Sequence, residues 1–388
     1  MALAALFTAL AAGAAMAART AKNPPLIIGA IEDRSGASAV VSKPVIETLR
    51  VQIPAINKRG GILKRKVVLI TEDDQGNPTL TPALVRRLID RGARAVIMAS
   101  GSASAVAAKP VLKQTQRVGI APTNISPAIV TPPDNEWSFS VAPSSGGIGM
   151  LYGLAWKSLD IKKVAFLADQ TPTITGSMPA AEAALTKLGI EVVAKELVPM
   201  TATDASPQVL RLQQARPDAV FVLSLGNQLE IVEQRTLKRL MPNTPRFGMP
   251  SLGAQTSTWA LAQPSDLDGL VYTSTLTAKN PRTVALTALL RSRLGKNYVI
   301  TDYNAQAYAA LQLLQQAFER AGGEDPVKVR NALETTKGFK APFGQPAFKL
   351  SYGPDRHFAS AGVCGFVLSV FKGNKPGGAW SKYQPRCT

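Results

Sequence analysis

Short apolar runs alternate with segments of helical period along almost the whole chain, and this alternation constrains the fold more than any other feature. The runs predict strands at residues 26–31, 67–70, 95–98, 118–121, 139–142, 164–167, 190–193 and 219–223. Helices are expected at 44–57, 80–88, 179–188, 281–294, 304–321 and 327–333, with others ending near 112 and 240. This succession is typical of parallel sheets with helices on both faces, so we expect an α/β protein.

The length of the chain indicates more than one domain. With 388 residues, it exceeds what one ordinary hydrophobic core accommodates, and two domains are expected. Pro54 is an irregularity in the helical pattern, because an interior proline removes a backbone hydrogen bond and costs about 3 kcal/mol. We expect the helix 44–57 to bend or end early at this residue.

The first 17 residues suit an export signal. An uncharged run from Leu3 ends in Ala15-Met16-Ala17, a small-residue cleavage pattern, and is shorter than the roughly 20 apolar residues of a membrane span. Arg19 is the first basic residue, which leaves the true start of the leader open, and a buried first helix is the alternative. We expect an exported protein without a later membrane-spanning segment.

A formal net charge of +18 distinguishes the chain. It is concentrated in the first part at Lys58, Arg59, Lys64, Arg65, Lys66, Arg86, Arg87, Arg91 and Arg94. No zinc-finger, basic-zipper or RNA-recognition pattern accompanies these residues, so a nucleic-acid partner is not expected. A solvated basic face and the steering of anionic solutes toward a cleft remain the two interpretations.

Two cysteines occur, Cys364 and Cys387, both near the C-terminus. In an oxidising compartment the pair can form a disulfide bond that ties down the tail. A buried, inert Cys364 with a free Cys387 remains the alternative. Their spacing does not suit a metal site, and none is expected.

The sequence offers little support for catalysis. A nicotinamide-dependent oxidoreductase is the alternative hypothesis, because a set of residues imitates a dinucleotide fingerprint: Gly147, Gly149, Gly153 and Asp169. In the true motif the first glycine closes the strand directly, whereas residues 143–146 intervene here. Two further residues are catalytic candidates. One is the single histidine, His357, and the other is Ser251, whose surroundings miss the G-x-S-x-G motif by one residue. We expect neither an enzyme nor a cofactor.

Small polar turns follow several of the expected strands. They lie at 101–104, 122–126, 169–177, 224–227 and 250–253. Ligands of such sheets sit outside the carboxyl ends of the strands, where turns and helix N-termini present backbone N–H groups. Each turn also suits ordinary capping, but five turns in register favour a solute-binding site.

Several segments together resemble one known family. They are 28–36, 56–63, 73–78, 88–90, 101–106 and 121–123. In this combination they resemble the solute-binding proteins of ABC importers, in the branch that includes the leucine/isoleucine/valine-binding proteins. Weaker similarity extends to about residue 370, so the resemblance covers almost the whole chain after the leader.

The resemblance implies a type I periplasmic binding protein fold, with two doubly wound, Rossmann-like lobes that are joined by three crossing strands and close on a ligand. The expected parts are a signal peptide at 1–17, lobe I at 25–142 plus 272–360, and lobe II at 143–271 plus 361–388. It also implies a periplasmic, monomeric, non-catalytic protein that delivers a small carboxylate to the membrane permease of an importer. Use of the same fold as a sensory module remains an alternative.

In the family, two turns of lobe I hold the ligand carboxylate through hydroxyls and backbone N–H groups. The matching residues here are Ser102, Ala103 and Ser104 in the first turn, and Thr123, Asn124 and Ile125 in the second. The resemblance implies that Ser102 donates from its side chain. It implies that Thr123 and Ile125 donate from the backbone, with Ile125 in the place of a hydroxyl residue.

Lobe II departs from the family pattern. Amino-acid binders place a carboxylate there against the ligand ammonium, and the corresponding residue here is Ser251. Their aromatic wall residues correspond to Val41, Thr173 and Leu225. Since a buried ammonium without an anion costs several kcal/mol, we expect Ser251 and Asn227 to offer only neutral hydrogen bonds. The expected ligand is therefore an aromatic or aliphatic acid rather than a free branched-chain amino acid.

Overall fold

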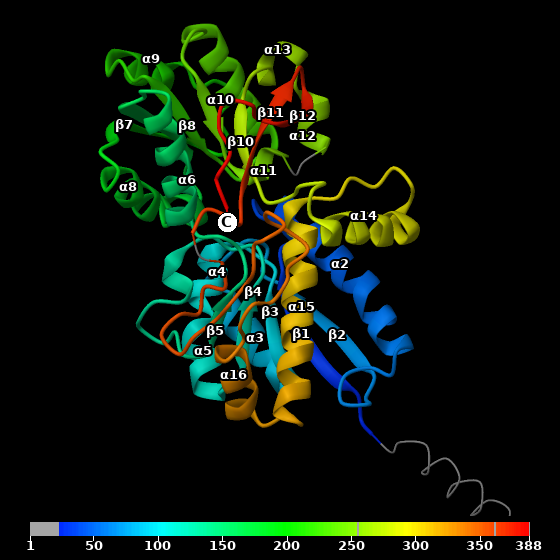
Figure 1. The fold of residues 1–388 in the computed structure, drawn as a ribbon. Helices are drawn as coiled ribbons and strands as arrows, with labels where there is room; N and C mark the ends of the chain where they lie inside the picture. The colour runs from blue at the N-terminus through cyan, green and yellow to red at the C-terminus, as the bar shows by residue number, and fades with distance from the viewer. Residues whose placement is uncertain (1–22, 254–255, 361, 388) are drawn as a thin grey trace, which may run out of the picture.

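The chain forms two lobes, each built on its own sheet (Figure 1). The computed structural model describes residues 23–253, 256–360 and 362–387. The expected leader at 1–17 lies outside the described residues. None of the helices in the described part of the chain combines the length and the apolarity that crossing a bilayer requires.

The first sheet has five parallel strands in the order β2-β1-β3-β4-β5. They are β1 Leu26–Glu32, β2 Val67–Asp73, β3 Ala93–Met98, β4 Val118–Ala121 and β5 Ser138–Ser140. Strand β3 is almost entirely buried, as expected for a parallel strand that is covered on both faces. The order reverses between β1 and β3, and a doubly wound sheet binds its ligand at such a switch point.

The second sheet has seven strands in the order β12-β11-β10-β9-β8-β6-β7. They are β6 Lys163–Asp169, β7 Glu191–Val198, β8 Ala219–Leu223, β9 Arg246–Gly248, β10 Val271–Ser274, β11 Val367–Lys372 and β12 Lys375–Ala379. The pairs from β7 to β10 are parallel, whereas β11 and β12 add an antiparallel edge. The carboxyl ends of β6, β8 and β9 therefore meet at one edge of the sheet.

Helices cover both sheets. The first lobe contains α2 Ala39–Lys58, α3 Thr81–Asp90, α4 Ser102–Ala107, α5 Lys109–Thr115, the short 3-10 helix η2 Pro127–Ile129, α14 Pro281–Leu294, α15 Asp302–Ala321 and α16 Pro326–Glu334. The second lobe contains α6 Ser145–Ser158, α7 Pro172–Thr175, α8 Met178–Thr186, α9 Ser206–Gln214, α10 Asn227–Leu240, α11 Pro250–Gly253, α12 Thr256–Leu261 and α13 Pro264–Leu267. Each lobe has its own hydrophobic core.

The chain passes between the lobes three times. It leaves the first sheet after β5, returns after β10, and enters the second sheet again before β11. Because β10 pairs with β9 and β11, residues 272–274 belong to the second sheet, and the return falls slightly later than the expected boundary. In the structure, a disulfide bond joins Cys364, in the third crossing, to Cys387 in the C-terminal tail.

The structure confirms the expected fold class and corrects several elements. Helix α2 begins at Ala39 and continues through Pro54 to Lys58, so the early end expected at this proline is wrong. Pro54 is exposed, and the carbonyl group of Arg50 that loses its partner lies on the same solvent face. The helix expected to run through Leu112 is divided at Ala108, because Pro110 has no N–H to continue it.

Candidate ligand-binding site

A narrow cavity lies between the two lobes, at the carboxyl ends of their strands. Both lobes and all three crossings contribute to its wall: Ser38, Val41, Ser100, Gly101, Ser102, Thr123, Asn124, Ile125, Ala142, Pro143, Ile148, Thr173, Ser224, Leu225, Met249, Pro250, Ser251, Thr275, Tyr303, Gln306 and Phe366. Its free volume is about 50 Å³, far below the roughly 300–1,000 Å³ of small-molecule sites. A ligand would therefore need the lobes to move apart.

No charged side chain lines this cavity among the described residues. A larger groove of about 820 Å³ lies elsewhere, on lobe I between α14, α15 and the segment 336–342. That groove is open and is lined by Arg282, Arg320, Lys337 and Lys340. We take the smaller cavity as the candidate site, because it lies where the strands of both sheets end, whereas the larger groove lies on lobe I alone.

The structure brings together most of the lobe I residues that the sequence predicted. Val41, Ser102, Thr123, Asn124 and Ile125 all line the cavity. Ala103 and Ser104, which the sequence predicted as contact residues, do not belong to the lining. Gly101 is the N-cap of α4, and the helix that starts at Ser102 carries the next two residues away from the wall.

Ser102 and Ile125 are bonded to each other. The backbone N–H of Ile125 donates to Ser102 Oγ at 3.2 Å. This N–H is therefore already engaged, which corrects its expected role as a free donor. Since the Ser102 oxygen accepts this bond, its own hydroxyl proton remains available to donate into the cavity. Thr123 Oγ1 is buried nearby and has no hydrogen-bond partner among the described residues.

Asn124 is held in one orientation by its surroundings. Its Nδ2 donates to the carbonyl oxygen of Ser100 at 2.7 Å. The backbone carbonyl oxygen of Asn124 accepts from Ser140 Oγ at 3.2 Å. Because the carbonyl oxygen of Ser100 can only accept, turning the side-chain amide of Asn124 round would break its bond to Ser100. Asn124 Oδ1 is left buried and without a partner in the described part of the structure.

Two buried aspartates support this wall from behind. Asp74 accepts from Ser100 Oγ at 2.7 Å and from Thr81 Oγ1 at 3.0 Å. Asp33 accepts from the backbone N–H of Ser38 at 2.8 Å. Burial raises the pKa of Asp33, and the negative charge of Asp74 acts in the same direction, while the backbone N–H donors oppose the shift. The two carboxyl groups thus fix the turns that present Ser38 and Ser100 to the cavity.

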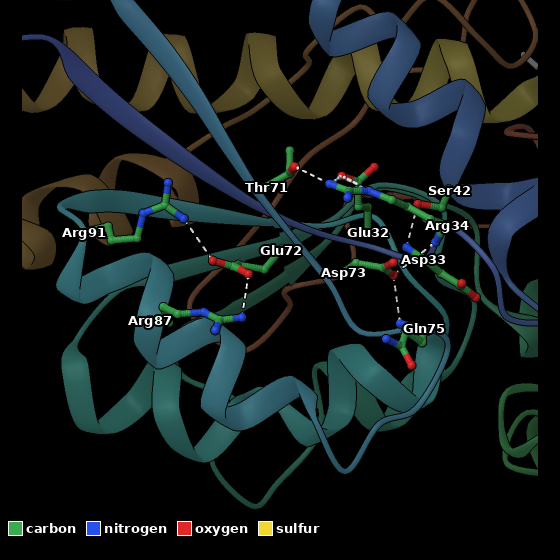
Figure 2. A network of polar contacts seen from close by, with 10 residues as sticks. All are labelled: Glu32, Asp33, Arg34, Ser42, Thr71, Glu72, Asp73, Gln75, Arg87 and Arg91. Carbon is green, nitrogen blue, oxygen red and sulfur yellow. Dashed lines mark hydrogen bonds and ion pairs between the residues drawn. The ribbon is translucent and has the colours of Figure 1, made fainter.

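Several basic side chains of lobe I serve ion pairs away from the cavity. Arg87 and Arg91 donate to Glu72 at 2.6 and 2.9 Å, and Arg34 donates to Glu32 at 2.6 Å (Figure 2). These three arginine side chains are more than half exposed. Exposed pairs of this kind contribute about 0–1 kcal/mol to stability. The arrangement favours a solvated basic face over the steering of anions.

On lobe II, the predicted residues Thr173, Leu225 and Ser251 line the cavity. Ser251 Oγ donates to the carbonyl oxygen of Ser224 at 2.6 Å, so its only proton is used, and it can only accept from a ligand. Asn227 begins α10, but its side chain lies outside the described part of the structure.

Asp169 organises the lobe II wall. Its Oδ2 accepts from the backbone N–H of Leu225 at 2.8 Å, and its Oδ1 accepts from the N–H and the hydroxyl of Thr171 at 2.9 and 2.5 Å. Thr171 in turn caps α7, which carries Thr173. Burial raises the pKa of Asp169, while these hydrogen bonds oppose the shift. One carboxyl group therefore positions both Leu225 and Thr173.

The structure also places near the site two acids that were not among the residues predicted from the sequence. Glu230 and Glu233 on α10 are fully buried, and all four of their carboxyl oxygens lack a partner within the described residues. Burial raises the pKa of both well above the usual range for glutamate, and the charges of neighbouring carboxyl groups act in the same direction. Neither lines the cavity, and Glu230 packs against Gly248 of β9.

Other wall residues were missed because they come from distant elements. Tyr303 and Gln306 lie one turn apart on α15, and Thr275 and Phe366 lie in crossing segments. All four are buried, with exposures of 6% or less. Ser100 directly precedes the predicted turn at 101–104, and Ser38 follows the family-like segment 28–36, so their proximity to these segments was the available signal.

The dinucleotide hypothesis does not fit the geometry. Its three glycines lie within α6, which Ser144 caps by accepting from the N–H of Gly147. A Cβ on Gly149 would approach the carbonyl oxygen of Ala181 to 2.4 Å, so this glycine lets α6 pack against α8. The proposed ribose partner, Asp169, holds the wall described above. The single histidine, His357, is buried against Phe139 and does not line the cavity.

Fold and site together define a two-lobed solute-binding protein, and comparison with known proteins agrees. Residues 25–372 match the family model described as periplasmic binding protein, and the chain belongs to this family. The chain is 26% identical over 330 residues to the Leu/Ile/Val-binding protein BraC3 of Rhizobium johnstonii, covering 84% of this chain and 87% of the relative.

Solved structures share the fold. One is the branched-chain amino acid transporter substrate binding protein LivJ from Streptococcus pneumoniae in complex with isoleucine, with a TM-score of 0.78, 16% identity, and coverage of 93% of this chain and 100% of that chain. Another is an ABC transporter solute binding protein from Rhodopseudomonas palustris in complex with benzoate, with a TM-score of 0.77, 17% identity, and coverage of 91% and 95%. Members of the family are extracytoplasmic, non-catalytic solute-binding proteins.

Proposed function

We propose that this protein is the solute-binding component of an ABC importer that captures a small aromatic or aliphatic carboxylate rather than a free branched-chain amino acid. The observation that carries the proposal is the uncharged cavity wall with free hydroxyl groups on lobe I. The protein would act as a monomer and deliver its ligand to the membrane permease of the importer.

The two lobes would divide the work of recognition. Residues 25–142 with 275–360 would hold the carboxylate, chiefly through the hydroxyl groups of Ser102 and Thr123. Residues 143–274 with 361–387 would contact the apolar body, because Ile148, Leu225 and Met249 form much of that wall. Hydrogen bonds to a charged group are worth about 1.5–3 kcal/mol each, so a few such donors are enough to orient a carboxylate.

An amino acid would leave its ammonium group without an anion. Ser251 replaces the expected carboxylate, and its proton is bonded to Ser224. Of the nearby acids, Asp169 is fully engaged by Leu225 and Thr171, and Glu230 does not line the cavity. A buried charge without a partner costs several kcal/mol. The fold itself serves both kinds of ligand, as the isoleucine and benzoate complexes of other proteins illustrate.

A thermal-shift screen tests this proposal. The protein is unfolded and refolded to remove carried-over ligand, and is then mixed with benzoate, phenylacetate, 4-methylpentanoate, leucine, isoleucine or valine. A ligand at 100 times its Kd stabilises the folded state by about 2.7 kcal/mol, so an acid that binds raises Tm clearly. If leucine or valine gives the largest shift and no acid gives any, the proposal is wrong.

A further inference from the structure

Three buried polar atoms on lobe I residues of the cavity wall have no hydrogen-bond partner among the described residues. They are Thr123 Oγ1, Asn124 Oδ1 and Gln306 Oε1, and the three residues are 3–6% exposed. Buried polar groups in proteins are normally paired with protein, water or ligand. The unpaired atoms therefore describe the chemistry that an occupant of the cavity must supply.

Asn124 requires a donor. Its amide is fixed by the bond from Nδ2 to the carbonyl oxygen of Ser100, so Oδ1 is an acceptor in any arrangement that keeps this bond. A carboxylate has only acceptors and cannot meet this requirement. Asn124 also lies between Thr123 and Ile125, in the turn proposed to hold the carboxylate. The required donor therefore belongs close to the carboxylate of the ligand.

Gln306 supplies the complementary group. It faces the same narrow cavity from α15, and neither end of its side-chain amide has a partner in the described part of the chain. The amide is therefore free to turn and present Nε2 as a donor. A hydroxyl group both donates and accepts, so one hydroxyl can give its proton to Asn124 Oδ1 and accept from Gln306 Nε2.

We propose that the ligand is a hydroxy acid, in which a neutral hydroxyl near the carboxylate bridges Asn124 and Gln306. This inference rests on the proposed function. An oxo acid can accept from Gln306 but leaves Asn124 without a donor, and a plain acid satisfies neither. An ammonium group can donate to both amides but brings a charge into a wall whose described residues include no anion.

Matched ligands test the proposal by isothermal titration calorimetry with the refolded full chain. One set is 2-hydroxy-4-methylpentanoate, 4-methyl-2-oxopentanoate, 4-methylpentanoate and leucine, and a second set is mandelate, phenylglyoxylate and phenylacetate, with both enantiomers of each hydroxy acid. We expect one hydroxy acid to bind at least about tenfold more tightly than its oxo, plain and amino analogues, because sites built around a hydroxyl reject ligands that lack it.

Gln306→Met removes the amide at similar size. The matched control is Gln312→Met, which lies on the same helix but lines the larger groove of lobe I. The first variant should weaken hydroxy-acid binding about tenfold and leave the plain acid unchanged, whereas the control should change neither. An unchanged hydroxy-acid affinity in Gln306→Met, or an oxo, plain or amino analogue that binds as tightly, would overturn the inference. Binding of oxo or plain acids alone would leave the proposed function standing, and binding of leucine alone would contradict both.

Discussion

The backbone N–H of Ile125 donates to Ser102 Oγ at 3.2 Å, and this bond joins the two lobe I turns that border the cavity. It uses the serine oxygen as an acceptor and so leaves the serine proton as a donor. The turn after β4 is thereby tied to the start of α4 before any ligand arrives. Preorganisation of this kind lowers the entropic cost of binding.

Ser102→Ala should weaken carboxylate binding about tenfold or more, because it removes a donor to a charged group. It also leaves the half-buried Ile125 N–H without its partner, so a loss of up to about 1 kcal/mol in the free energy of unfolding is expected. Calorimetry with the acid identified in the screen measures the first effect, and urea unfolding measures the second. Ser104→Ala, behind the wall, is the control and should leave affinity unchanged. Equal affinities of wild type and Ser102→Ala would contradict the carboxylate site.

Ser251→Glu should change the ligand preference. A carboxylate at this position would pair with a ligand ammonium, so leucine should gain affinity while plain acids lose it through repulsion between like charges. Ser251→Gln has nearly the same size without the charge and controls for crowding in a narrow cavity. The measurement is the ratio of the leucine and acid Kd values. A ratio that is the same in both variants would show that residue 251 does not face the ligand.

Asp169→Asn should weaken both folding and binding. An amide has a single acceptor oxygen and cannot satisfy Leu225 and Thr171 together, so a loss of about 1–3 kcal/mol in the free energy of unfolding is expected. Affinity should fall as well, because Leu225 and Thr173 shift. Asp218→Asn is the comparison, since Asp218 accepts two backbone N–H groups at the opposite edge of the same sheet. That variant should lower stability without altering Kd.

Glu233 should make the protein less stable as pH rises. Burial raises its folded-state pKa well above the usual range, so the folded protein keeps a proton that the unfolded chain releases above about pH 4.5. The free energy of unfolding should therefore decrease by about 1.4 kcal/mol per pH unit for this group until its folded-state pKa is reached. Glu233→Gln should reduce this slope and stabilise the protein at pH 7.5. The exposed control Glu191→Gln should leave the pH dependence of the free energy of unfolding unchanged. If Glu233→Gln has the same pH dependence as the wild type, the pKa of Glu233 is not raised.

Loss of the disulfide bond should destabilise the protein without changing ligand choice. Cys364 and Cys387 are separated by 23 residues, and closing a loop of this length is typically worth about 2–4 kcal/mol. The double change to serine should lower the free energy of unfolding by this amount, and a reducing agent should lower that of the wild type alone. A free-thiol assay on the unreduced protein provides the check, since two free thiols would contradict the bond.

Much of the fold could be predicted because buried parallel strands are continuous apolar runs. The bounds of β4 and β8 match the expected ones, and α14 matches as well. Strands β9 and β12 could not be predicted, because the first is three residues long and the second contains proline and glycine. Helix α6 was missed because its glycines resemble a loop, although they serve close packing of helices.

The site divides in the same way. Ser102, Thr123 and Leu225 follow strand ends, where turn chemistry identifies a ligand edge from sequence alone. Gln306 has no such signal, because a position on a buried helical face indicates only that the residue is covered. The bond between Ser251 and Ser224 could not be predicted from the sequence either, because it depends on how the turns after β8 and β9 meet.

The three crossings between the lobes supply part of the wall at Pro143, Thr275 and Phe366. A solute bound there lies beside the segments about which the lobes move. Its width would therefore set the angle between the lobes in the closed form. Two solutes with the same polar head but different bulk would then leave the protein in differently shaped bound forms. A permease that docks across both lobes could then distinguish solutes of different size by the angle between the lobes.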